Sequence, residues 1–464
     1  MAFFLSTLII LLGAIFYLRK PQWFFLSWMS LNPVVLPIFC LVTLMFDRET
    51  FMACQNSVRD SGRNLFLLIF LLEYVRSKKL PNLKHTYLIL FLLCLYILLQ
   101  GFILHPNVIK IWPELSELLS LLLPLVIMLM RPDMLPSASS LFRFLGVIIA
   151  IQVCGALLNI NGIHTYLTFY IPYDYLLGNG SVYFGEEGLA MGTFPSPVYL
   201  ANFCTTLFLF LSLEYFSRRD ISAKYYYLAA IVIIFLVAVS GIKVCLVLCI
   251  LLLWMCCLMY AKRHSLLLFL VTFVGLIGYI TLLSIDVKGL ESSDNNAGVT
   301  RQVLGLARAV QASEATETGT TGLSAYLIDN YFDRSPVIGN ALSYKGEYAY
   351  GNYGSVDLTC FKADARLALI LVEYGIIGSI LYFMFFFSIT LFLCKKVAKN
   401  ERKKLLLCFG FYFALTIVDP GFFDRFNYPL MFLYALCILN RSSEWSRSNS
   451  GSQMKINRVY EKVS

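Results

Sequence analysis

Charged residues are scarce in this chain. Asp, Glu, Lys and Arg make up only 14% of its 464 residues, whereas 59% of the residues are apolar and the mean hydropathy is +0.73. Soluble globular domains carry about 25% charged residues, so this composition excludes an ordinary water-soluble fold. The apolar runs also lack the alternation of apolar and polar residues that is typical of membrane β-barrels. The sequence therefore predicts an all-α polytopic integral membrane protein with about 12–13 transmembrane helices.

Several functional signatures are missing as well. The 13 cysteines show no metal-ligand spacing, and most lie in apolar runs, where cysteine acts as a small hydrophobic residue. No glycine-rich nucleotide loop and no internal repeat is visible. We therefore expect no metal, no other cofactor and no ATP site. The net charge of +9 does not indicate nucleic acid binding, because membrane topology accounts for most of it.

Basic residues mark one side of the predicted membrane domain. Of the 37 Lys and Arg residues, 24 fall in alternate short loops between the apolar segments or in the tail. The positive-inside rule assigns these loops, and the C-terminus, to the cytoplasm. With thirteen spans, the N-terminus is then external. The predicted spans are residues 2–18, 23–46, 64–75, 86–104, 115–130, 141–158, 197–216, 225–239, 244–260, 265–284, 367–393, 405–418 and 428–439.

The spans predict a single transmembrane domain over residues 1–439, followed by a disordered cytoplasmic tail over residues 440–464. The first apolar run has no basic region before it and no cleavage site after it, so we expect an uncleaved span rather than a signal peptide. Two long polar segments, 159–196 and 285–366, are predicted to be external loops. Function is expected there.

The loop over residues 285–366 contains two amphipathic stretches, "GVTRQVLGLARAV" and "GLSAYLIDNYF". In the first, Arg301 and Arg308 lie on a different helical face from the apolar residues. The two predicted helices either pack over the bundle with their charges in water or cover a cavity that holds a membrane-embedded anion.

Three cations in segments predicted to be external stand at positions where a basic residue is not expected. Lys243 and Arg366 each begin a predicted span, where the helix dipole disfavours a cation, and Arg334 precedes a Ser-Pro pair. Basic side chains together with free helix N-terminal N–H groups favour an anion such as phosphate. The alternative is that Lys243 and Arg366 extend to lipid headgroups.

Asp364 stands two residues before Arg366. It is either the N-cap of the helix that begins there or a general base beside a cationic pocket. Glu186, Glu187 and His164 are further external candidates for acid or base chemistry, and each is equally compatible with an ordinary loop residue.

Four motifs, in this order along the chain, show a family resemblance: "GTFPSPVYLANF", "SGIK", "DRSPVIGNAL" and "DARLALILVEYGIIG". Over residues 188–440 the chain resembles the O-antigen polymerase and ligase superfamily, bacterial membrane enzymes that join lipid-linked oligosaccharides. Ligases of this superfamily tend to carry His where Asp364 stands, and Lys243 replaces an Arg. The polymerase branch is therefore the better fit.

The resemblance implies a metal-independent glycosyltransferase with a helical, GT-C-like fold in the bacterial cytoplasmic membrane. It would polymerise repeat units into O-antigen, capsular or exopolysaccharide at the outer face. Donor and acceptor would both be glycans on polyprenyl pyrophosphate, and membrane lipid and a chain-length regulator protein are the other candidate partners. The residues implied are Lys243, Arg334 and Arg366 on the pyrophosphate, Asp364 as base, Arg301 and Arg308 for steering the donor, Glu186 and Glu187 as substrate-binding carboxylates, and Tyr350 and Tyr353 for stacking on sugars.

Other classes of protein remain as alternatives. One is a ligase that transfers the glycan to a lipid acceptor, and another is a flippase or transporter for lipid-linked glycans. Transporters usually show repeats, interrupted helices and ionisable residues along the pathway, and the sequence shows few of these features. Glu73, Glu117, Glu214 and Glu373 are predicted near the ends of spans. An acyltransferase would be expected to show a membrane His, which is not obvious here.

Overall fold

The protein is all-α and polytopic, and no strand occurs in the parts of the chain that the structure describes. The structure is a computed structural model. It describes residues 2–30, 64–77, 80–81, 83–104, 122–131, 135–160, 190–194, 197–218, 221–260, 266–267, 270–275, 277–278, 332, 335–340, 366–418, 430–439 and 441.

Four of the described helices are long and apolar enough to cross a bilayer, which needs about 20 residues. They are α5 (Lys84–Leu104), α7 (Ala138–Ile160), α9 (Pro197–Arg218) and α18 (Arg366–Lys396). The others with labels are α1 (Ala2–Arg19), α2 (Pro21–Ser30), α10 (Ala223–Val239), α11 (Lys243–Met259) and α19 (Lys399–Val418). Residues 64–77, 122–130 and 430–439 are also helical. The predicted all-α membrane fold is confirmed.

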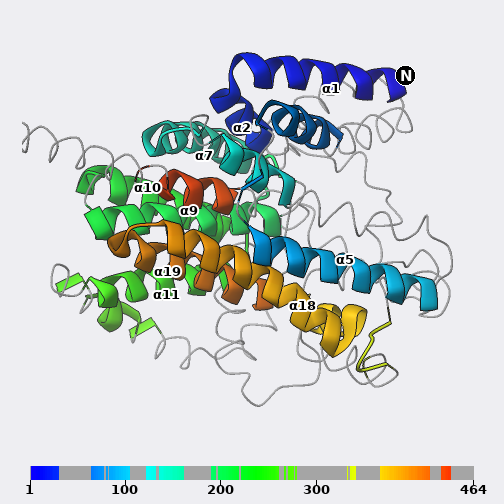
Figure 1. Ribbon diagram of the computed structural model, residues 1–464. Helices are drawn as coiled ribbons and strands as arrows, with labels where there is room; N and C mark the ends of the chain where they lie inside the picture. The colour runs from blue at the N-terminus through cyan, green and yellow to red at the C-terminus, as the bar shows by residue number, and fades with distance from the viewer. Residues whose placement is uncertain are drawn as a thin grey trace, which may run out of the picture.

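Helix α9 forms the centre of the bundle. In its membrane-spanning window 94% of the residues are buried, and α10, α11 and α19 pack around it (Figure 1). Several of its polar side chains have partners on neighbouring helices: Asn202 accepts from the Cys245 thiol at 3.1 Å, and Ser212 lies 3.2 Å from the Tyr226 hydroxyl. The ring of Tyr215 stacks on that of Tyr226 with centroids 4.1 Å apart. A span with this many polar groups is stable because neighbouring helices supply partners.

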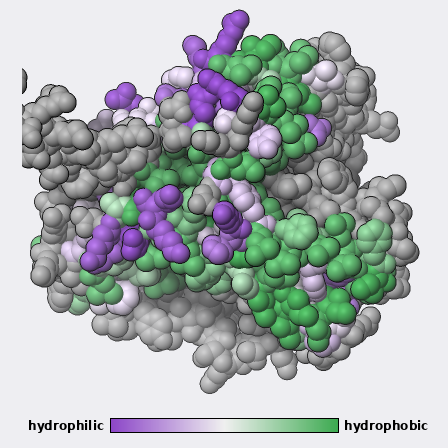
Figure 2. Space-filling model, viewed as in Figure 1, coloured by the Kyte–Doolittle hydropathy of each residue, from purple (hydrophilic) through white to green (hydrophobic). Residues whose placement is uncertain are grey.

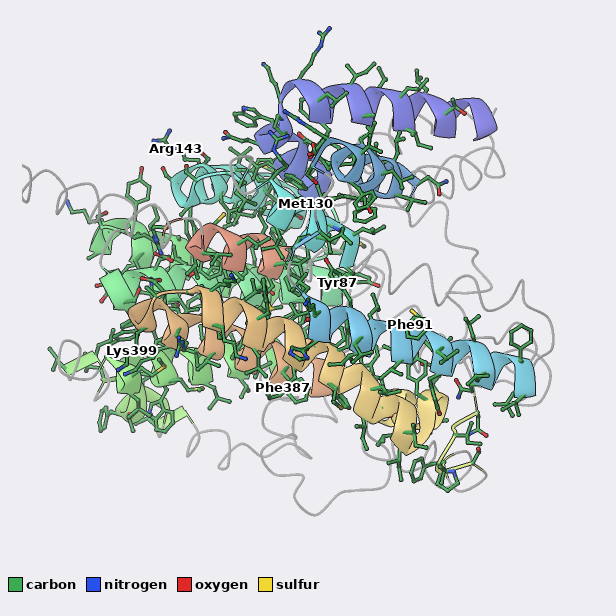
Figure 3. All side chains as sticks on the ribbon, viewed as in Figure 1. Tyr87, Phe91, Met130, Arg143, Phe387 and Lys399 are labelled. Atoms are coloured by element: carbon green, nitrogen blue, oxygen red, sulfur yellow. The ribbon has the colours of Figure 1, made fainter. Side chains whose placement is uncertain are left out.

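The outer helices behave differently. Only 28–33% of the spanning windows of α5, α7 and α18 are buried, and their remaining faces are apolar. Figure 2 shows hydrophobic residues gathered over α5 and α18, and Figure 3 labels two of them, Phe91 and Phe387, which are more than 60% exposed. Helices that are apolar on their outward face are typical of a bundle surrounded by lipid.

Two clusters of buried charges hold helix ends together. The Glu73 carboxylate accepts from the Tyr17 hydroxyl at 2.9 Å and lies 3.4 Å from the Arg131 guanidinium. In the second cluster, Arg441 binds Glu214 through both carboxylate oxygens, at 2.9 and 3.1 Å.

Lys404 joins the second cluster from α19. Its ammonium lies 3.1 Å from Glu401 and 3.5 Å from Glu214, and it is 1% exposed. Tyr434 donates to Glu214 at 2.9 Å. All six chain segments in the two clusters end on the side that the basic loops assign to the cytoplasm, so the contacts agree with the predicted alternation of the spans. The assignment of that side to the cytoplasm stays a prediction.

Several sequence predictions lie outside the described residues. These include the two amphipathic stretches of loop 285–366 apart from Phe332, nearly all of loop 159–196, and the tail apart from Arg441. The count of thirteen spans and the division at residue 439 therefore stay predictions.

Candidate functional site at a break in helix α18

Helix α18 is interrupted at Gly375. Its φ of 63° and ψ of −171° are non-helical, and a positive φ is a conformation that glycine adopts without the penalty of a side chain. The 21 residues after the break, 376–396, rise about 31 Å and suffice to cross the hydrocarbon core. The break therefore lies near the membrane surface opposite to Lys395 and Lys396.

A short loop, residues 335–340, fills the break. The N–H groups of Ile376 and Ile377 donate to the carbonyl oxygens of Pro336 and Val337 at 2.9 and 3.3 Å. In return, the N–H of Asn340 donates to the Val372 carbonyl at 2.8 Å. The loop thus replaces the backbone hydrogen bonds that an unbroken helix would make, as is required where little water is present.

The loop approaches α18 at two glycines. A Cβ on Gly375 would lie 2.6 Å from the carbonyl carbon of Ile338, and a Cβ on Gly339 would lie 2.6 Å from that of Tyr374. Gly339 also has a positive φ, 79°. Both positions need glycine for conformation and for space.

Helix α5 holds the loop and the break together through two side chains one turn apart. The Gln100 amide nitrogen donates to the carbonyl oxygens of Ile338 at 2.7 Å and Glu373 at 2.6 Å. The Tyr96 hydroxyl lies 2.7 Å from the Tyr374 carbonyl and also contacts that of Ile338. Carbonyls freed by the break are therefore satisfied from a third element. Gln100 is 1% exposed, and its Oε1 has no hydrogen-bond partner within the described part of the chain.

A second irregular region links the ends of α7, α9 and α10. The Ala190 N–H donates to the Val239 carbonyl at 2.9 Å, just before the turn at Ser240 and Gly241 that leads into α11. Gln152 of α7 accepts from the Thr193 N–H at 2.8 Å and donates to its hydroxyl at 2.7 Å. These contacts join the segment before α9 to the turn before Lys243.

The helix starts expected from the sequence are found: α11 begins at Lys243 and α18 at Arg366. Arg366 lies nine residues before Gly375, and Arg334 immediately precedes the docked loop. The backbone positions of Lys243 and Arg366 are described, but their side chains are not. The other predicted site residues lie outside the described residues: Asp364, Arg334, Arg301, Arg308, Glu186, Glu187, Tyr350, Tyr353 and His164.

The structure adds site residues that sequence reasoning missed. Tyr96 and Gln100 were not singled out, although Gln100 interrupts the apolar run "YILLQGFIL" and a polar residue there is a usable signal. The sequence did not reveal the interruption of α18, because the hydrogen bonds that allow the break come from a loop more than thirty residues earlier in the chain.

This arrangement fixes backbone segments rather than displaying reactive groups. It anchors the segments that carry Arg334 and Arg366 to one another, and it anchors the turn before Lys243 to the segment after Glu186 and Glu187. The described residues contain no group of three or more His, Cys, Asp or Glu side chains that would hold a metal ion.

Comparisons with models of protein families, with curated proteins and with solved structures give no match to this chain.

Proposed function

We propose that this protein is a membrane glycosyltransferase that polymerises polyprenyl-pyrophosphate-linked oligosaccharide repeat units at the outer face of the bacterial cytoplasmic membrane. One observation carries the proposal. Two of the motifs on which the resemblance rests contact each other: "PVIG" docks on "EYG" at the break in α18. The contact at the break brings together two motifs that lie more than thirty residues apart in the sequence. In addition, Ala190, two residues before the motif that begins at Gly192, donates to the carbonyl of Val239, the residue before "SGIK".

The proposed chemistry is transfer of the donor glycan from pyrophosphate to an acceptor hydroxyl. The bond between the anomeric carbon and the pyrophosphate oxygen breaks, and the acceptor oxygen forms the new glycosidic bond. Asp364 takes the proton from the acceptor hydroxyl, and polyprenyl pyrophosphate leaves with its charge held by Lys243, Arg334 and Arg366. Glu186 and Glu187, Arg301 and Arg308, and Tyr350 and Tyr353 are proposed to bind the glycan chains and the donor.

The anchored backbone supports these roles. Arg366 begins a segment of about 13 Å that ends at the break, and Arg334 lies two residues before Pro336, which bonds to Ile376. A rigid backbone reduces the cost of holding cations of like charge around one anion.

A second candidate is export of the lipid-linked glycan, and the broken helix favours it. Discontinuous helices are a feature of secondary transporters, where they form substrate sites. A ligase is the third reading, since it shares the chemistry and differs in acceptor.

One experiment distinguishes the polymerase, the exporter and the ligase. A deletion strain is complemented with wild type, Asp364→Asn or Arg366→Ala, and its surface glycans are resolved on a gel. Loss of polymer with single repeat units still displayed is expected for a polymerase. Loss of all external glycan would indicate export, and polymer that stays on the polyprenyl carrier would indicate a ligase. Lys395→Ala, an exposed cation at the opposite end of α18, is the matched control and should retain polymer. Full activity of both site variants would overturn the site assignment.

A further inference from the structure

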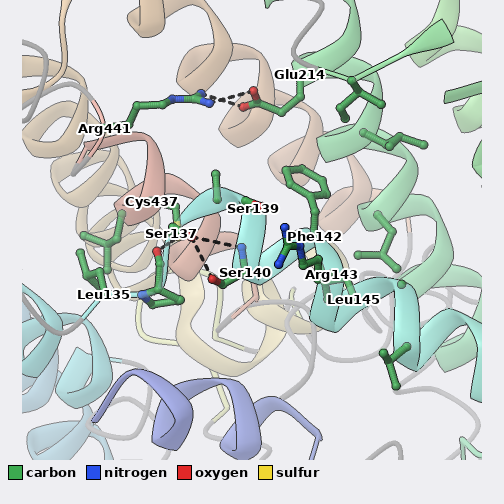
Figure 4. A pocket seen from close by; sticks show the side chains of 18 of the residues that line it. Leu135, Ser137, Ser139, Ser140, Phe142, Arg143, Leu145, Glu214, Cys437 and Arg441 are labelled. Carbon is green, nitrogen blue, oxygen red and sulfur yellow. Dashed lines mark hydrogen bonds and ion pairs between the residues drawn. The ribbon is translucent and has the colours of Figure 1, made fainter. Parts of the chain in front are cut away.

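A large groove lies at the other end of the bundle, away from the break in α18. Its volume is about 1760 Å³, and it is bordered by α7, α9, α10 and the helix over residues 430–439 (Figure 4). Pockets for small soluble ligands span about 300–1,000 Å³, so this groove is larger than such a ligand needs. It is independent of the glycosyltransferase proposal.

The groove is polar at one end and apolar along the rest. Serine residues at the start of α7 and the cations Arg143, Lys396 and Arg441 line the polar end. Leu145 and Ile149 of α7 and Ile233 of α10 line the apolar part. From Ser137 to Ala150 the wall runs about 20 Å, comparable with the ~15 Å of one leaflet.

The charge at the polar end is positive. Glu214 is the acidic residue in the lining, and it is already held by Arg441, Lys404 and Tyr434. Arg143 and Lys396 are exposed, and no described carboxylate forms an ion pair with either of them. Lys396 lies 5.9 Å from the ring centre of Phe392. Two cations that no described carboxylate neutralises favour an anionic headgroup.

We propose that this groove binds an anionic diacyl phospholipid, with its headgroup at the cationic end and its acyl chains along α7 and α10. The walls belong to transmembrane helices, so molecules of the bilayer have direct access. A basic pocket between such helices at the cytoplasmic side is an established form of lipid headgroup site. By the predicted topology, the lipid comes from the cytoplasmic leaflet, which is the anionic source, whereas the polyprenyl pyrophosphate of the proposed reaction is at the other face.

Gly146 is a suitable position for testing whether lipid occupies the groove. It lines the groove, and a Cβ at this position would meet no atom within 4 Å. Gly146→Leu places a branched side chain in the wall of the groove and leaves the cations unchanged. Gly410→Leu is the matched control: Gly410 of α19 is exposed, also has open space around it, and lies outside the groove. Both changes replace a helical glycine by a good helix former, so neither is expected to unfold the protein.

The experiment is native mass spectrometry of the full-length protein, delipidated in detergent and titrated with phosphatidylglycerol or phosphatidylcholine. Wild type and Gly410→Leu should retain phosphatidylglycerol in preference to phosphatidylcholine. Gly146→Leu should lose this retention, and Arg143→Ala and Lys396→Ala should each weaken it about fivefold. Lys395→Ala, next to Lys396 but outside the groove lining, should leave it unchanged.

Three outcomes would overturn the proposal. One is equal retention of phosphatidylglycerol by Gly146→Leu and Gly410→Leu. Another is equal retention of the two phospholipids by wild type. The third is displacement of phosphatidylglycerol by polyprenyl phosphate at lower concentration, which would assign the groove to the carrier lipid. A melting temperature within a few degrees of wild type for both glycine variants excludes misfolding as the cause.

Discussion

Gly339 of the docked loop lies against Gly375 of α18 so closely that neither residue has room for a Cβ. This contact lets a loop complete the hydrogen bonding of a broken transmembrane helix. It joins two segments whose neighbouring residues, Arg334 and Arg366, are the proposed pyrophosphate ligands.

Gly375→Ala should destabilise the protein by about 2–4 kcal/mol, because a positive φ adds strain and the new methyl group meets the Ile338 backbone. The melting temperature in detergent and the surface glycan gel measure the two effects. Gly410→Ala is the control and should be neutral or slightly stabilising, since its surroundings are open and the site is helical. An unchanged melting temperature for Gly375→Ala would show that the break does not need glycine.

Gln100→Leu should cost about 1–3 kcal/mol, because it removes the donor shared by the Ile338 and Glu373 carbonyls in a buried site. Tyr96→Phe should cost about 1 kcal/mol. Since both side chains bind the Ile338 carbonyl, the double variant should be non-additive in denaturant unfolding. If the losses of stability in the two single variants add up to the loss in the double variant, Gln100 and Tyr96 act independently. Leu99→Ala, at a position 53% exposed, serves as the neighbouring control.

Lys404→Met should destabilise the protein by about 3–5 kcal/mol, because it leaves Glu214 and Glu401 buried with one cation fewer. Lys403→Met, the adjacent and exposed position, should change stability by less than about 0.5 kcal/mol. Adding Glu401→Gln to Lys404→Met should recover part of the loss, since it removes the charge left unpaired. Equal effects of the two lysine substitutions would contradict the buried network.

The membrane orientation is tested with reporter fusions. Green fluorescent protein fused after residue 464 should be fluorescent, because the positive-inside rule assigns the C-terminus to the cytoplasm. Alkaline phosphatase fused after Leu104 or Ile160 should be active, because these helix ends are predicted to face outside. The reverse pattern at all three positions would invert the topology, and with it the face on which the proposed reaction occurs.

Much of the architecture follows from local properties of the chain. The predicted spans 86–104, 141–158, 197–216 and 225–239 lie within observed helices, since apolar composition and length are readable residue by residue. The predicted span 367–393 lies within α18 but is interrupted at Gly375. The start of α11 follows from the turn at Ser240 and Gly241 before it, and the sequence also predicted a helix that begins at Arg366. The partners of the buried charges could not be predicted in the same way. Glu73 and Glu214 were expected near span ends, but the guanidinium groups closest to them, those of Arg131 and Arg441, come from other segments of the chain.

The sequence by itself determined that this chain is an all-α membrane protein, because scarce charge and long apolar runs leave helices in lipid as the stable solution. It also placed the motifs in their order along the chain. Only the tertiary structure decided that α18 breaks at Gly375, because a glycine inside a helix costs only about 1 kcal/mol and does not by itself break it. The break exists because Pro336, Val337 and Gln100 supply the hydrogen bonds of a helix from elsewhere, and Gln100 meets its carbonyls 238 and 273 residues away. Contacts at such separations depend on how the helices pack, which no local pattern encodes.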